Sequence, residues 1–269
     1  MPQSAEGPVK VRIEERGSSG HVAHLSIANA ARMNSLSSVV MEAFVDAVTE
    51  LSKDEQLRVL VITGEGERAF VGGADVFELN SLDRNTARAF ISRVHAMSKS
   101  IRDLPVPVIA RVNGICLGAG VEVMAACDLR VATEGAVFGM PEVKIGLPSV
   151  VEAALFPQLI GWGRTKQLVY TGENISAAEA VEWGLVEKVV LAEDLDDAVE
   201  SWVAAIVEAG PRAIRLQKEL VRLWEALPVN DAIQEGIRNF ARAFDSDEPT
   251  RMTGEVVERL RRRRAERQS

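Results

Sequence analysis

The chain has few of the residues that build disulfide frameworks and metal sites, and it lacks the long apolar run of a membrane span. Its 269 residues include two cysteines, three histidines and one tyrosine. Cys116 and Cys127 form neither a CxxC pair nor part of a larger framework, so we expect buried free thiols in a reducing compartment. No apolar run reaches the ~18 residues that a membrane-spanning helix needs, and residues 1–10 lack the apolar segment of a signal peptide. These absences predict a cytoplasmic protein that does not enter a membrane.

The histidines do not predict a metal site. His21 and His24 lie in residues 21–28, which have the pattern of a strand. Because their positions differ by an odd number, their side chains are expected to point to opposite faces of that strand. His95 stands alone in a helical pattern and is interpreted as structural. We therefore expect no metal.

The balance of charge is acidic. The formal net charge is −8 at pH 7, which argues against a dedicated nucleic-acid-binding protein. Hydrophobic residues make up 47% of the chain and charged residues 26%, so a large core is expected. One basic cluster, Arg259 and Arg261–Arg264, lies near the C-terminus. Such a run is typical of a solvated helix end, and nucleic-acid binding through it is disfavoured because no aromatic side chains accompany the arginines.

Hydrophobic periodicity predicts an α/β first part followed by helices. Strands are expected at residues 9–14, 21–28, 58–63, 106–112 and 129–133. Helices are expected at residues 37–51, around 90–104, and at 121–126, 165–170, 177–183, 194–208, 211–227 and 231–243. We divide the chain into a core, residues 1–196, and a C-terminal helical region, residues 197–269.

Two glycine-rich segments each follow a strand pattern and precede a helix pattern. They are Val71-Gly72-Gly73-Ala74-Asp75 and Gly118-Ala119-Gly120-Val121. Each leaves backbone N–H groups free at a helix N-terminus, and its small side chains let a ligand approach the backbone. Neither matches GxGxxG or the P-loop. Two such turns converging on one point would form an oxyanion hole, whereas the alternative is tight packing of helix against strand. Asp75 with Glu78 has the form of a capping box.

Two carboxylates stand out by their surroundings. Glu122 follows the second glycine-rich turn between two valines, where burying a charge is costly unless it has a partner or a use. Stabilisation by the helix dipole is the alternative. Glu142 ends the segment Phe138-Gly139-Met140-Pro141-Glu142, and its alternative reading is an exposed loop acid. Taken with the paired turns, the two carboxylates indicate acid–base chemistry.

These segments together resemble the enoyl-CoA hydratase/isomerase (crotonase) family. The matching stretches are Arg32–Leu36, Ala69–Asp75, Pro107–Gly114, Leu117–Glu122, Phe138–Glu142, Trp183–Val186 and Phe240–Asp247. They follow one another in the family's order from about Val11 to Leu260, and this order makes the resemblance far more specific than any single motif.

The resemblance implies a fold, a site and an assembly. The fold would be a crotonase-like spiral of ββα turns with a C-terminal α-helical trimerisation region, in a homotrimer or a hexamer built as a dimer of trimers. Backbone N–H groups of Ala74 and Ala119 would hold the thioester oxygen, while Glu142 gives a proton to the α-carbon and Glu122 positions the water. The residues expected to contact substrate or coenzyme A are Arg32, Ser35, Gly72, Ala74, Asp75, Val76 and Ala119. Coenzyme A is part of the substrate, so no separate cofactor is expected. The basic tail would alternatively touch coenzyme A phosphates of a neighbouring subunit.

The chain departs from the family after Pro148. A glycine-rich run ending in a glycine pair is usual there, but this chain has Ser149-Val150-Val151-Glu152-Ala153. No Asp stands near Ser149, which disfavours the dienoyl-CoA isomerases and aryl-CoA dehalogenases of the family. Ser149 with Glu152 predicts a capping box that opens the next helix, and the alternative is a third active-site carboxylate. The acyl pocket is expected to be lined by residues 77–95 and by the region around Ser149.

We therefore predict an enoyl-CoA hydratase acting on an acyl-CoA substrate. A Δ3-Δ2 enoyl-CoA isomerase needs a single base, so the presence of both Glu122 and Glu142 favours hydration. A CoA-thioester hydrolase of the same family is a second alternative, because the same oxyanion hole serves acyl transfer. A non-catalytic RNA-binding protein acting through the basic tail is the alternative from a different class.

Overall fold

The computed structural model describes residues 7–267, which fall into two compact units that part between Ala204 and Ala205. Residues 1–6, part of the segment without a signal-peptide pattern, and residues 268–269 lie outside the described residues. The predicted functional division between residues 196 and 197 stays a prediction. The first unit carries both sheets, and Cys116 and Cys127 are buried in it as free thiols, as predicted.

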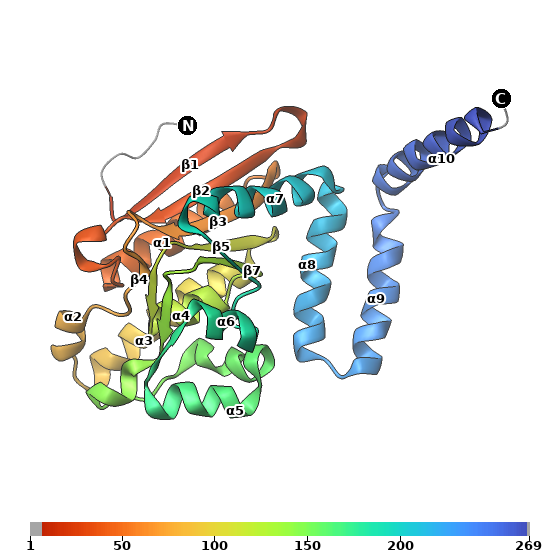
Figure 1. Cartoon of the computed structure of the whole chain (residues 1–269). Helices are drawn as coiled ribbons and strands as arrows, with labels where there is room; N and C mark the ends of the chain where they lie inside the picture. The colour runs from red at the N-terminus through yellow and green to blue at the C-terminus, as the bar shows by residue number, and fades with distance from the viewer. Residues whose placement is uncertain (1–6, 268–269) are drawn as a thin grey trace. The chain divides into compact units, whose positions relative to one another are not determined.

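A six-stranded sheet forms the frame of the first unit (Figure 1). Its order is β1-β2-β3-β5-β7-β10, and only β1 and β2 pair in antiparallel fashion. The strands are β1 (Val9–Glu15), β2 (His21–Ile27), β3 (Leu57–Gly64), β5 (Val108–Val112), β7 (Leu129–Thr133) and β10 (Lys188–Val190). β3 is almost wholly buried, as its continuous apolar run predicts for a central parallel strand.

A smaller sheet holds the two glycine-rich segments. Its order is β4-β6-β8-β9, with β4, β6 and β8 parallel and β9 antiparallel to β8. Each strand is three residues long: β4 (Ala69–Val71), β6 (Ile115–Leu117), β8 (Val137–Gly139) and β9 (Asn174–Ser176). A strand of this length shows no hydrophobic period, so the sequence did not predict this sheet.

Helices cover the sheets and begin at recognisable caps. They are α1 (Ser38–Leu51), α2 (Val76–Asn80), α3 (Arg84–Asp103), α4 (Ala119–Ala125), α5 (Phe156–Thr171) and α6 (Ala177–Trp183). Ser37 caps α1 by accepting from the N–H of Val40, and Asp83 opens α3 with a capping box. α1 and α3 pack together, and their apolar faces enter the core. α5 is longer than predicted and is interrupted at Gly161.

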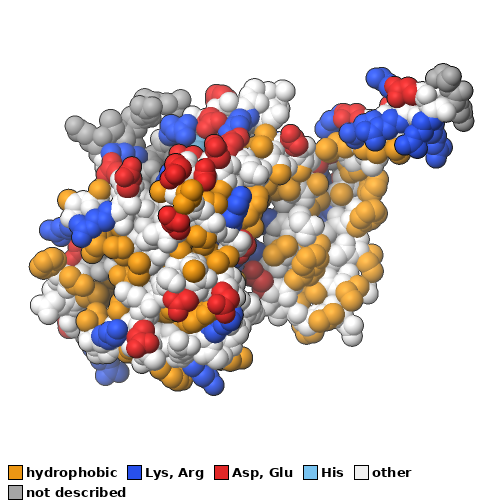
Figure 2. Space-filling view, viewed as in Figure 1, with side chains coloured by type: hydrophobic (Ala, Val, Ile, Leu, Met, Phe, Trp, Pro, Cys, Tyr) orange, Lys and Arg blue, Asp and Glu red, His pale blue; other side chains and the backbone are white. Residues whose placement is uncertain are grey.

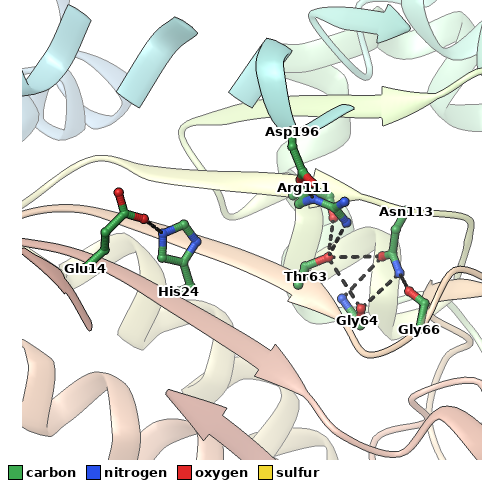
Figure 3. A network of polar contacts seen from close by, with 8 residues as sticks. All are labelled: Glu14, His24, Thr63, Gly64, Gly66, Arg111, Asn113 and Asp196. Carbon is green, nitrogen blue, oxygen red and sulfur yellow. Dashed lines mark hydrogen bonds and ion pairs between the residues drawn. The ribbon is translucent and has the colours of Figure 1, made fainter. Parts of the chain in front are cut away.

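A polar network ties the loops that lead into β4 and β6 (Figure 3). The Asn113 amide donates to the carbonyl oxygen of Gly64 at 2.9 Å and also to that of Gly66. The Thr63 hydroxyl donates to the carbonyl oxygen of Arg111 at 3.0 Å. These bonds join the end of β3 to the end of β5, so they fix the loops from which both short strands start.

The second unit is helical. α7 (Leu195–Glu208) crosses the boundary between the units, and α8 (Pro211–Ala226), α9 (Val229–Ala243) and α10 (Glu248–Glu266) follow. α8 and α9 lie side by side (Figure 1). The Glu248 carboxylate accepts from the N–H groups of Arg212 and Ala213 at the start of α8, where the helix dipole favours negative charge.

Two surfaces of the second unit stand out. α9 and its C-cap residue Phe244 expose an apolar face at the spacing of a helix face, made of Val229, Ile233, Ile237, Phe240 and Phe244. The arginines of the basic tail lie exposed on α10, where Figure 2 shows Lys and Arg side chains gathered. Within residues 7–267, no helix has both the length and the apolar composition that crossing a membrane requires.

Candidate active site

The two glycine-rich turns meet because their strands are neighbours. β4 and β6 pair in parallel, so both turns leave from the same edge of the small sheet. Gly73 has φ 107° and Gly118 has φ 52°, conformations that side chains disfavour. A Cβ atom at Gly73 would lie 3.3 Å from the Leu117 carbonyl oxygen, and one at Gly120 would lie 2.4 Å from that of Val71. Only glycines allow the two turns to approach this closely.

Two backbone amides are left free at this junction. The N–H of Leu36 donates to Gly73 and the N–H of Asp75 donates to Leu36, so Ala74 between them turns its own N–H to the other side. Ala119 is the first residue of α4, and Gly118 before it supplies no capping side chain. Neither amide has a hydrogen-bond partner among residues 7–267. Both residues line one cavity.

The cavity has an apolar wall and an acidic end. Its volume is about 130 Å³, and it is lined by side chains from α2, from α3 and from the loop before Ser149. Its apolar lining includes Val76, Leu79, Phe90, Ile91, Val94 and Leu147. Residues 77–95 and the region around Ser149, the two segments expected to line the acyl pocket, both contribute to this cavity. Glu122 and Glu142 lie in the same cavity.

Glu122 is a buried acid in the first turn of α4. The N–H of Ala153 donates to its Oε1 atom at 3.2 Å. Burial in the first place, and then the nearby carboxylates of Glu142 and Glu152, raise the pKa of Glu122 to about 8, against the opposing effect of the Ala153 and Val150 amides. The side chain therefore carries a proton at neutral pH.

Glu142 belongs to the 3₁₀ helix η3 (Pro141–Ile145) and is not an exposed loop acid. Burial raises its pKa, and the hydroxyl of Ser149, which donates to Oε2 at 3.0 Å, acts in the opposite direction. A Cβ atom at Gly118 would lie 2.5 Å from Oε1 of Glu142. The glycine thus leaves room for this carboxyl beside the turn that carries Ala119. The charge of Glu142 is one of the causes that raise the pKa of Glu122, so the two carboxyls interact.

The residues expected to bind coenzyme A line a groove next to the cavity. Arg32, Ser35, Gly72, Ala74, Asp75 and Val76 contribute to this groove, and three of them (Gly72, Ala74 and Val76) also line the cavity. The Arg32 guanidinium is 60% exposed, forms an ion pair with Asp75 at 3.2 Å and lies 5.5 Å from the centre of the Phe77 ring. A cation therefore stands in a groove that shares three lining residues with the cavity of the two carboxyls.

The capping box predicted at Asp75 is only half present. The Asp75 carboxylate accepts from the N–H groups of Phe77 and Glu78 and so caps α2. The reciprocal bond is absent because the N–H of Asp75 donates to Leu36 and the Glu78 carboxylate accepts from Ser38 instead. Contacts with Leu36 and Ser38, which lie outside α2, therefore replace the reciprocal bond of the capping box.

The capping box predicted at Ser149 and Glu152 is wrong. Residues 151–155 form a 3₁₀ helix, η4 (Val151–Leu155), without a side-chain cap. Ser149 instead contacts Glu142, and Oε1 of Glu152 lies 2.7 Å from Nδ1 of His95. Val151 has φ 37°, a strained conformation for a β-branched residue that costs about 1–3 kcal/mol. This turn directs the two side chains to different partners. The sequence pattern indicated neither contact, and His95 stands alone in that pattern.

No group of three or more His, Cys, Asp or Glu side chains is placed to hold a metal ion within the described part of the chain. The cavity itself offers two carboxyls beside two N–H donors. This combination can stabilise negative charge on a carbonyl oxygen and move protons at the neighbouring carbons.

Comparison with known proteins agrees with this class of site. The sequence profile of the family described as enoyl-CoA hydratase/isomerase matches residues 17–262. The chain belongs to this family, and it is an enzyme of the crotonase superfamily. The short-chain-enoyl-CoA hydratase of Clostridium acetobutylicum is 32% identical over 89% of this chain and 93% of that protein. The crotonyl-CoA hydratase of Syntrophomonas wolfei is 40% identical over 69% and 72% of the two chains.

Solved structures confirm the predicted α/β crotonase fold with C-terminal helices. An enoyl-CoA hydratase from Bacillus anthracis superposes with a TM-score of 0.87 at 31% identity, covering 93% of this chain and 96% of that one.

Proposed function

We propose that this enzyme is an enoyl-CoA hydratase, which adds water across the 2,3 double bond of an enoyl-CoA thioester. The observation that carries the proposal is the meeting of two free amides and two interacting carboxyls in one apolar cavity. The names of the two relatives, both hydratases, support it.

The amides of Ala74 and Ala119 serve as the oxyanion hole. Attack of water on the β-carbon pushes negative charge onto the thioester oxygen, and two fixed N–H donors stabilise this charge without reorganisation. Their free orientation toward the cavity supports the role. The groove at Arg32 is proposed to take the coenzyme A part, which leaves the apolar wall for the acyl chain.

The two carboxyls divide the proton transfers. Glu122 positions the water and takes its proton, while Glu142 gives a proton to the α-carbon. The pair holds one proton before the reaction and one after it, because the proton given to the substrate is replaced from water. In the ligand-free protein this proton resides on Glu122. The proposed roles therefore require that this proton pass to Glu142 before the α-carbon is protonated.

A panel of CoA thioesters analysed by mass spectrometry tests the proposal. Hydration adds the mass of one water, isomerisation moves the double bond without a change of mass, and hydrolysis releases the free acid. We expect water addition to 2-enoyl thioesters, and loss of this activity in Glu122→Gln and Glu142→Gln. A double-bond shift or a free acid as the only product would instead identify an isomerase or a hydrolase.

We also propose a homotrimer, alone or paired as a hexamer, formed through the C-terminal helices in the cytoplasm. The exposed apolar face of α9, which includes Phe240 and Phe244, supports an interface there. Light scattering should report a trimer or a hexamer. A monomer at micromolar concentration would refute this assembly.

A further inference from the structure

A buried carboxylate lies behind the proposed acid–base pair. The Glu152 side chain is 4% exposed, and its Oε1 atom lies 2.7 Å from Nδ1 of His95 on α3. Its Oε2 atom is buried and has no hydrogen-bond partner among the described residues. Burying a carboxylate with one oxygen unpaired is unfavourable. The His95 ring is 53% exposed, so the pair reaches from solvent to the interior.

Residues on both sides of Glu152 hold the carboxyl of Glu122. The N–H of Ala153 donates to Glu122 at 3.2 Å, and the amide of Val150 also bonds to it. Between them, the strained turn at Val151 changes the direction of the chain. The segment 150–153 is thus a backbone cradle for Glu122.

The cradle is tied to α3 by the His95–Glu152 contact. α3 also supplies Phe90, Ile91 and Val94 to the wall of the cavity. His95 and Glu152 themselves are not among the residues that line it. The His95–Glu152 contact joins α3, which forms part of the cavity wall, to the segment 150–153 and does not itself line the cavity. It is therefore suited to hold the carboxyl of Glu122 in position relative to the wall.

We propose that His95 and Glu152 are positioning residues for the proposed hydration, holding the segment 150–153 so that its amides fix the Glu122 carboxyl in place. This inference rests on the proposed function. Accurate placement matters because a small displacement of a reacting group costs much of the rate.

The same pair acts on Glu122 through its charge. In the described structure, the acidic groups acting on Glu122 are Glu142 from η3 and Glu152 from η4, and the titratable group that faces Glu152 is His95 from α3. The negative charge of Glu152 raises the pKa of Glu122. A neutral residue at position 152 therefore lets Glu122 lose its proton at a lower pH. This effect follows the charge of Glu152 and not its contact with His95, so it can be measured separately from the loss of that contact.

Two pairs of variants separate the contact from the charge. Glu152→Gln keeps an oxygen for His95 and removes the charge, whereas Glu152→Ala removes both. His95→Asn keeps a donor near the place of Nδ1, whereas His95→Ala does not. We expect kcat to fall about tenfold or more in the two alanine variants and to stay within about threefold in Glu152→Gln and His95→Asn, with KM little changed in all four. Arg93→Ala, which removes a different α3 contact, to Glu42, is the matched control and should leave kcat unchanged.

Infrared spectroscopy of the ligand-free protein supplies a readout that needs no substrate. The band of the protonated Glu122 carboxyl is identified by its loss in Glu122→Gln and is followed with pH. In Glu152→Gln its midpoint should move to lower pH, and in Arg93→Ala it should not move.

The outcomes are distinct. Folded alanine variants that keep wild-type kcat, equal losses in His95→Asn and His95→Ala, or an unmoved midpoint in Glu152→Gln would each overturn the inference. If the wild-type protein hydrates no thioester, the proposed function fails, and the infrared comparison still decides whether Glu152 acts on Glu122.

Discussion

The buried acid Glu122 should make the protein less stable as pH rises. Its pKa is about 8 in the folded protein against 4.5 for an ordinary glutamate. Between these values the folded state keeps a proton that the unfolded chain has lost, so stability falls with increasing pH and levels off above the folded pKa. Each pH unit inside this window corresponds to about 1.4 kcal/mol. From pH 5.5 to pH 9 the contribution of Glu122 therefore falls by about 3 kcal/mol.

Glu122→Gln isolates this contribution because the amide stays neutral at every pH. Urea unfolding of the wild type and the variant, at one protein concentration, gives both free energies of unfolding at pH 5.5 and at pH 9. The value for the variant minus that for the wild type should grow by about 3 kcal/mol between the two conditions. Glu173→Gln, at an exposed position, should show no such growth. An equal difference at both pH values would mean that Glu122 ionises normally, and the account of the pair would be wrong.

The remaining predictions concern catalysis. Glu142→Gln should lower kcat by about 10²–10⁴ with KM little changed; a variant within a few-fold of wild type would remove Glu142 from the mechanism. Ala119→Pro deletes the N–H that is proposed to bind the thioester oxygen and should cost about 10² or more in kcat, whereas Ala119→Ser keeps that donor and should retain more activity. Both need circular dichroism and oligomer size that match wild type, and normal hydration by a well-folded Ala119→Pro protein would place the second donor elsewhere. The kcat/KM of the wild type should fall above about pH 8, because the pair then loses the proton that it gives to the substrate; a rate that is flat to pH 10 contradicts this.

Local patterns were sufficient for the long elements of the fold. The apolar run of β3 and the spacing of Phe90, Val94 and Met97 in α3 reflect burial on a regular period, which a sequence displays directly. The three-residue strands β4 and β6 have no such period. The sequence showed two candidate glycine-rich turns but not that they meet. The pairing of β4 with β6 in the structure brings them together.

The region after Pro148 shows why a local pattern can mislead. Ser149 and Glu152 have the spacing of a capping box, and nothing nearby in the sequence contradicts that reading. Their partners come from other elements. Ser149 donates to Glu142, and Glu152 contacts His95, which lies 57 positions earlier in the chain. The backbone of Val151 makes both contacts possible. Such partners are decided by tertiary packing, which a motif of four residues does not encode.

The two amides are backbone groups and the two acids are side chains, and this difference affects which substitutions the enzyme can accept during evolution. The amides of Ala74 and Ala119 belong to the main chain and depend on small residues packed between two neighbouring strands. The carboxyls are side chains and can be replaced one at a time. A descendant of this protein that loses Glu122 or Glu142 would keep the two amides that are proposed to bind the thioester oxygen, and new side chains around them could serve another reaction. Substitution at the glycines of the turns displaces the two amides themselves. Related sequences should therefore vary more at the two acids than at these glycines.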